Sequence, residues 1–169
     1  DAYAIAAKVA GLSMNPQSVD EITAITEKLK EQKSVVQSYV MDEVFDKMGG
    51  GEAALAPYYV GDGVTMMADN PDLAMFIPAE GTNIYIDAMC IPKGCQNKEG
   101  AEAFINFLCR PDISAANLDY IGYSTPETAA KEYLDEEIVN DPVAYPDDET
   151  LARSESFAEL SIEATQQMN

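Results

Sequence analysis

The sequence contains no histidine and no tryptophan in 169 residues, and it has only ten lysine and arginine residues against 30 aspartates and glutamates. The absence of histidine excludes a Ser-His-Asp or Cys-His nucleophile, a His-ligated zinc ion and an imidazole pH switch. The formal net charge of −20 repels nucleic acid and anionic membranes, so we expect neither as a partner. The same charge attracts cations, which leaves a cationic small ligand, a basic protein or a metal ion.

Cysteine is also scarce, and the three residues Cys90, Cys95 and Cys109 form no CxxC pair. Because Cys90 lies in an apolar alternation, we expect the cysteines to be small buried hydrophobic residues, although one disulfide is left open. No apolar run approaches the roughly 20 residues of a membrane helix, so we expect no membrane insertion by this segment. The sequence begins without Met, and Asp1 leads directly into a helical pattern. We therefore expect the chain to be a piece of a longer protein.

Local signals predict several helices. Asp1 stands where an N-cap is expected, and Ser18 with Glu21 fits a capping box. The three consecutive glycines that start at Gly49 are expected to end a helix. Pro111 suits the first position of a helix. The predicted helices cover residues 2–10, 18–32, about 40–48, 97–109 and a further segment from 111.

Three short apolar segments, at residues 53–60, 73–78 and 84–91, are bounded by turn residues and predict buried strands. Residues 63–71 between the first two predict one or two helical turns. Strands that alternate with helices favour the α/β class. The apolar fraction of 47% is sufficient for a core.

The region 127–163 carries twelve acids and two bases. Apolar residues interrupt it, so we expect solvated helix surface rather than an acidic recognition tail. Asp147, Asp148 and Glu149 lack the spacing and the glycine of a calcium loop, and they are expected to begin a helix. Neither glycine-rich segment matches a phosphate-binding motif. We interpret Gly61 to Gly63 as a turn and the glycines at 49–51 as a helix stop. No catalytic nucleophile stands out, and we do not expect an enzyme.

The most informative local pattern is Tyr85-Ile86-Asp87. In a strand, residues two apart share a face, so a π face and a carboxylate would point the same way. This pair suits an organic cation through cation–π attraction and charge-assisted hydrogen bonds. A core tyrosine beside a surface aspartate is the plainer interpretation of the same pattern. The same two interpretations, a contact for an organic cation or a core tyrosine, apply to Tyr58 and Tyr59.

Longer motifs identify a family resemblance. The segments FIPAEGTNIYIDAMCIPKGCQNKEGAEAFINFLCRPD (Phe76 to Asp112), IGYSTPETAAKEYL and NDPVAYPDDETL resemble the C-terminal half of the spermidine/putrescine-binding proteins of bacterial ABC transporters. The similarity extends from Asp1 to about Leu160. It implies a type II periplasmic-binding-protein-like, two-lobed α/β solute receptor, here a fragment with most of the second lobe and a return segment of the first. The implied division is second lobe 1–86, crossover and first lobe 87–134, and acidic C-terminal helices 135–169 that pack on the second lobe or hinge.

The resemblance also implies ligand-binding residues. Asp1 and Asp87 would pair with ammonium groups, while Tyr59 and Tyr85 would flank the methylene chain. Tryptophan is common in the family where Tyr59 and Tyr85 stand, and this departure affects the choice between putrescine and spermidine. Phe157 replaces a polar contact of some members, so that contact is not carried over. The first-lobe contacts precede Asp1, so the chain would hold about half of a binding site.

The implied function is extracytoplasmic polyamine binding for delivery to the permease of an ABC transporter, without a cofactor. The protein would lie in the periplasm, or on the outer face of the cell membrane as a lipoprotein or permease fusion. The alternatives are a receptor for another small ligand, such as an amino acid or a metal complex, and an acidic calcium-binding or protein-interaction module.

Overall fold

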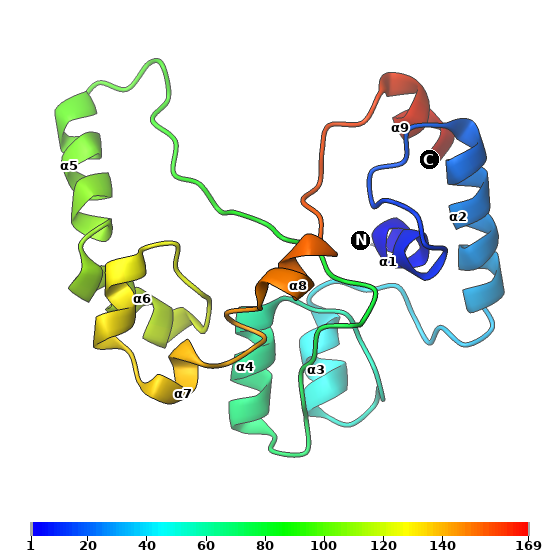
Figure 1. Ribbon diagram of the computed structural model, residues 1–169, viewed down its shortest axis with the longest axis horizontal. Helices are drawn as coiled ribbons and strands as arrows, with labels where there is room; N and C mark the ends of the chain where they lie inside the picture. The colour runs from blue at the N-terminus through cyan, green and yellow to red at the C-terminus, as the bar shows by residue number, and fades with distance from the viewer. Residues whose placement is uncertain (1, 169) are drawn as a thin grey trace. The chain divides into compact units, whose positions relative to one another are not determined.

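The computed structural model describes residues 2–168, and these residues are mostly helical (Figure 1). They contain nine α-helices, the 3-10 helix η1 and an isolated parallel bridge between Asn83 and Glu155. None of the helices within this range combines the length and the apolar character that crossing a bilayer demands. The elements are α1 (Ala2–Val9), α2 (Val19–Gln32), α3 (Glu43–Gly49), α4 (Val60–Asp69), α5 (Lys98–Leu108), α6 (Pro111–Ile121), η1 (Thr128–Tyr133), α7 (Glu136–Val139), α8 (Asp148–Ala152) and α9 (Ile162–Met168).

The predicted helices are confirmed where a local signal defines their ends. Ser18 accepts a hydrogen bond from the backbone N–H of Glu21, and the Glu21 side chain accepts one from the backbone of Ser18, which completes the capping box of α2. Pro111 stands in the first turn of α6, and Gly122 ends that helix in the left-handed conformation. The Asp147 carboxylate caps α8, as expected for a helix start.

The three predicted strands do not form among residues 2–168. Residues 73–78 and 84–91 lie outside every helix and strand, and Val60 at the end of the first predicted strand begins α4. A strand requires a neighbour that exchanges backbone hydrogen bonds with it. Here such an exchange is limited to the bridge, where Ile84 N donates to Glu155 O (2.8 Å) and Glu155 N donates to Thr82 O (3.0 Å). The prediction of strands from apolar character was therefore wrong for all three segments, because none of them has a partner strand within the described residues.

The chain divides into two compact units. The first unit comprises Asp1–Val40, Ile77–Ile86 and Asp147–Asn169, and the second comprises Met41–Phe76 and Asp87–Pro146. In the first unit α1 and α9 both contact α2 (Figure 1). Its core consists of Ala6, Ala7 and Ile25, with Tyr3, Leu12 and Leu29 packed against it.

A polar clasp joins α1 to the C-terminal part of the first unit. The Lys8 ammonium contacts the Glu155 carboxylate (Nζ to Oε1, 2.6 Å) and donates to the Arg153 carbonyl (2.9 Å), while the Ser13 hydroxyl donates to the second Glu155 oxygen. Gly81 has a φ of +95°, and a Cβ there would lie 2.0 Å from the Arg153 carbonyl oxygen. Only glycine fits this close approach of two backbones.

In the second unit α6 packs closely on η1, and α3 contacts α4. The α5 helix has the expected apolar stripe, yet none of its residues is buried. The cysteines also differ from the expectation of buried residues. Cys90 and Cys109 are exposed and Cys95 is partly exposed, and all three are free thiols. Cys90 lies in one of the segments that lack a strand partner, so nothing covers it within the described chain.

Candidate ligand-binding site

Two adjacent tyrosine rings mark the start of α4 in the second unit. Tyr59 is the N-cap residue in extended conformation, and its carbonyl accepts a hydrogen bond from Gly63 N (2.9 Å). The ring centroids of Tyr58 and Tyr59 are 5.8 Å apart at an interplanar angle of 48°, which is a tilted aromatic pair. Tyr59 is 42% exposed.

A carboxylate is fixed beside this pair by a tyrosine from another part of the same unit. Asp62, in the first turn of α4, accepts a hydrogen bond from the Tyr123 hydroxyl (3.3 Å). The Tyr123 ring lies directly over Gly61, where a Cβ would be only 1.9 Å from the ring. Gly61 and Gly63 therefore belong to a helix start and not to the predicted turn, and the missing side chain of Gly61 lets Tyr123 reach Asp62.

The electrostatics of this cluster favour positive charge. Burial, followed by the negative charges of Asp62 and Asp42, raises the pKa of Tyr58 above its ordinary value. The same negative potential that disfavours a phenolate stabilises a cation. We name the set Tyr58, Tyr59, Asp62 and Tyr123 the tyrosine cluster. It offers π faces and a carboxylate, the groups that recognise an organic ammonium ion.

The other predicted site residues fall in separate parts of the chain. Tyr85 belongs to the first unit, next to Ile84, whose backbone N donates to the Glu155 carbonyl, and it is exposed. Asp87 begins a segment of the second unit and is exposed. Asp1 lies outside the described residues. Tyr85 and Asp87 are thus each described within their own unit, and of the predicted site residues that the structure describes, Tyr59 is the one that lies in a cluster of aromatic and acidic groups.

Sequence reasoning missed Asp62 and Tyr123. The spacing between them is 61 residues, so only the fold brings them together. The available signal was Gly-Asp-Gly at 61–63 directly after two tyrosines. An aspartate in the first turn of a helix next to an aromatic pair is a recognisable pattern, but the glycines suggested a turn instead.

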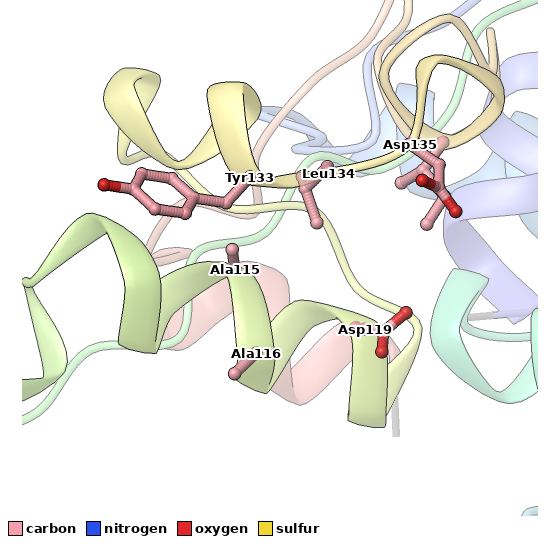
Figure 2. Close-up of a pocket in the computed structure, with 7 residues that line it drawn as sticks. Ala115, Ala116, Asp119, Tyr133, Leu134 and Asp135 are labelled. Carbon is pink, nitrogen blue, oxygen red and sulfur yellow. The ribbon is translucent and has the colours of Figure 1, made fainter.

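A separate hollow lies between α6, η1 and α7 in the second unit, with a volume of about 270 Å³ (Figure 2). Figure 2 shows the Tyr133 ring at one end and the carboxylates of Asp119 and Asp135 at the other, with Ala115 on α6 below Leu134. Asp135 begins α7, but its carboxylate makes no capping hydrogen bond. Like the tyrosine cluster, the hollow combines a tyrosine ring with carboxylates, and the two share no residue. Among residues 2–168 no group of three or more cysteine, aspartate or glutamate side chains is arranged to hold a metal ion.

Comparison with known proteins gives the class of the chain. The family described as bacterial extracellular solute-binding protein matches residues 1–146. The spermidine/putrescine-binding periplasmic protein of Salmonella typhimurium is 33% identical over 155 residues, which cover 92% of this chain and 44% of that protein. The putrescine-binding periplasmic protein SpuD of Pseudomonas aeruginosa is 37% identical over 92 residues, or 54% of this chain and 25% of that protein. The chain belongs to the family of bacterial extracellular solute-binding proteins.

Solved structures agree with this family. The spermidine/putrescine ABC transporter substrate-binding protein from Streptococcus pneumoniae matches with a TM-score of 0.91 and 30% identity, covering 99% of this chain and 52% of that chain. A putative spermidine/putrescine ABC transporter protein from Listeria monocytogenes matches with a TM-score of 0.87 and 33% identity over the same shares. The chain therefore has the fold of part of a two-lobed periplasmic binding protein, and it spans about half the length of these relatives.

Proposed function

We propose that the chain supplies one side of a polyamine-binding site in an extracytoplasmic solute receptor. The observation that carries this proposal is the tyrosine cluster, whose π faces and carboxylate match the ligands named for the relatives. Putrescine and spermidine are flexible chains of methylene groups between ammonium ions. They need separated carboxylates with apolar or aromatic walls between them.

The same proposal gives the predicted residues their roles. Tyr59 and Tyr85 flank the methylene chain, while Asp87 and Asp1 pair with ammonium groups. Asp62, held by Tyr123, adds negative potential beside Tyr59. The ligand is delivered to the permease of an ABC transporter, and the chain performs no catalysis.

The lobe assignment is part of the proposal. Residues 1–86 form most of the second lobe, 87–134 cross to the first lobe, and 135–169 pack back as acidic helices. The passage of the chain from one compact unit to the other between Ile86 and Asp87 supports a crossover there. Residues Met41–Phe76 lie in the second compact unit, so the lobes of the receptor are not simply these units.

A chimeric receptor tests the proposal. In it, the chain replaces the matching half of the S. pneumoniae protein, so that both walls of the site are present. Isothermal titration calorimetry with putrescine and spermidine should detect binding, and Tyr59→Ala should weaken it about tenfold or more because a π face is lost. Asp69→Asn, which removes an exposed carboxylate at the other end of α4, serves as the matched control and should leave affinity unchanged.

The result that contradicts the proposal is a chimera that melts cooperatively but binds neither polyamine. Binding that is equally strong in wild type and Tyr59→Ala removes Tyr59 from the site. If a panel of amino acids and metal complexes stabilises the chimera where polyamines do not, the receptor serves another ligand.

A further inference from the structure

The residues that lead into Tyr85 pair with the C-terminal part of the first unit. Thr82 N donates to the Ser154 hydroxyl (3.1 Å), and Thr82 O accepts from Glu155 N (3.0 Å). Ile84 N, directly before Tyr85, donates to the Glu155 carbonyl (2.8 Å). The backbone of Glu155 therefore sets where the chain lies as it enters Tyr85.

The side chain of Glu155 contacts a different part of the unit. One carboxylate oxygen lies 2.6 Å from Lys8 Nζ in α1, and the other accepts from the Ser13 hydroxyl. The Lys8 and Glu155 side chains are 14% and 28% exposed, against 41% and 66% for the surface pair of Lys28 and Glu31. A charge-assisted contact that is shielded from water holds its geometry better than an exposed ion pair. One residue thus links α1 to the segment before Tyr85.

A second side chain keeps this part of the chain in place. Asn15 Nδ2 donates to the Ser156 carbonyl (3.0 Å), and Asn15 Oδ1 accepts from Ala158 N (2.7 Å). The residues that follow Glu155 are therefore held by the loop after α1, while its carboxylate is held by Lys8. Glu155 is a fixed point between two segments and differs in this from a surface ion pair.

We propose that Glu155 is a positioning residue of the polyamine site, which holds the Tyr85 ring in place for the ligand without contacting the ligand itself. The α1 helix that Glu155 contacts begins directly after Asp1 in the sequence, so the clasp relates two segments that adjoin predicted ligand residues. A ring whose backbone is held before binding loses less conformational freedom when the ligand arrives. The inference rests on the proposed function, because it takes Tyr85 as a ligand contact.

The fluorescence of a single tryptophan tests the positioning without a ligand. Because the sequence contains no tryptophan, Tyr85→Trp gives the chain alone one fluorophore at this position. Its time-resolved anisotropy should decay with the tumbling of the chain, and the addition of Glu155→Gln should introduce a faster component as the segment loosens. Two controls should leave the decay unchanged. Glu159→Gln removes an exposed acid nearby, and Ile25→Val lowers the melting temperature from the core of the same unit.

A double-mutant cycle in the chimeric receptor tests the consequence for binding. Glu155→Gln should weaken putrescine binding about fivefold. The loss should shrink to less than about twofold when Tyr85→Ala is already present, because Glu155 acts through Tyr85. Ile25→Val should leave the affinity unchanged, which separates positioning from a general loss of stability. Calorimetric titration of the four proteins of the cycle and of the control measures these affinities.

Three results overturn the proposal: an anisotropy decay that Glu155→Gln does not alter, a faster component that Ile25→Val produces as well, and a loss of affinity from Glu155→Gln that is equal with and without Tyr85. A chimera that melts cooperatively and binds neither polyamine contradicts the proposed function. In that case the anisotropy of the chain alone still decides whether Glu155 holds residue 85 in place.

Discussion

At the scale of single residues, Gly61 has a role that depends on having no side chain. Its missing Cβ admits the Tyr123 ring, and the Tyr123 hydroxyl then reaches Asp62. In the proposed polyamine site such a fixed carboxylate is an advantage, because a charge held in place loses less entropy when a ligand binds.

Asp87 provides the first residue-scale prediction. In the chimeric receptor, Asp87→Asn should weaken polyamine binding by about 2 kcal/mol, or roughly 30-fold, because a charge-assisted contact is replaced by a neutral one. Calorimetric titration of the wild-type chimera and of its Asp87→Asn variant measures the loss of affinity, with Asp69→Asn as the control. Unchanged affinity in Asp87→Asn would remove Asp87 from the site.

The second residue-scale prediction concerns the titration of Tyr58. Asp62→Asn should lower the pKa of Tyr58 part of the way toward its ordinary value, since burial remains the larger cause of its rise. NMR titration of the labelled tyrosine ring carbons follows the change. Asp69→Asn should not move this pKa, and a Tyr58 that titrates identically in Asp62→Asn would show that the two residues are not coupled.

At the scale of elements, the helices could be predicted from sequence and the strands could not. The Ser18 capping box and Pro111 are signals confined to a few residues, and each marks a real helix start. A strand depends on a neighbour that is distant in sequence. Residues 84–91 alternate as a strand would, but the backbone hydrogen bond described for them is the one from Ile84 N to Glu155 O, so the pattern alone could not say whether a ladder forms.

The same distinction applies to the site. The family resemblance predicts Tyr59 as a ligand contact, whereas the contact between Asp62 and Tyr123 depends on the packing of α4 against the loop after α6. The burial expected for the cysteines was also wrong, since Cys90 and Cys109 are exposed and Cys95 is partly exposed.

The clasp between α1 and the C-terminal part gives the element-scale prediction. Hydrogen bonds from Lys8 and then Ser13 hold the pKa of Glu155 below its ordinary value. A lowered pKa in the folded state means that the carboxylate stabilises the fold above the pKa of the unfolded state, near 4.3. This stabilisation is lost as pH falls through the folded pKa. The melting temperature should therefore drop more steeply in wild type than in Glu155→Gln as pH is lowered from 6 toward about 3.

The Glu155→Gln variant should itself be about 1 kcal/mol less stable at neutral pH. Thermal melts followed by circular dichroism measure both effects. Glu159→Gln, an exposed acid nearby in sequence, should keep the wild-type pH dependence. If the melting temperatures of wild type and Glu155→Gln fall in parallel as the pH is lowered, titration of Glu155 in the clasp is excluded as the cause.

At the scale of the whole molecule, the chain matches about half of a receptor. We therefore predict that the chain alone and the chimera differ in their affinity for polyamines. The 169-residue chain alone should bind putrescine and spermidine more weakly than about 1 μM, because the opposite wall is missing and the ammonium groups stay hydrated. The chimera should bind more tightly by tenfold or more. Calorimetry on both proteins at the same salt concentration measures the two affinities. Micromolar or tighter binding by the chain alone would contradict the prediction.

The backbone of residues 87–91, which lies outside every helix and strand, governs how the molecule behaves in solution. Segments of this kind associate between copies when nothing keeps the copies apart, and the net charge of −20 supplies that repulsion near neutral pH. Near the isoelectric point of about 4.1 the repulsion vanishes, and high salt screens it. We therefore expect the solubility of the isolated chain to fall as the pH approaches 4.1 and as salt is added.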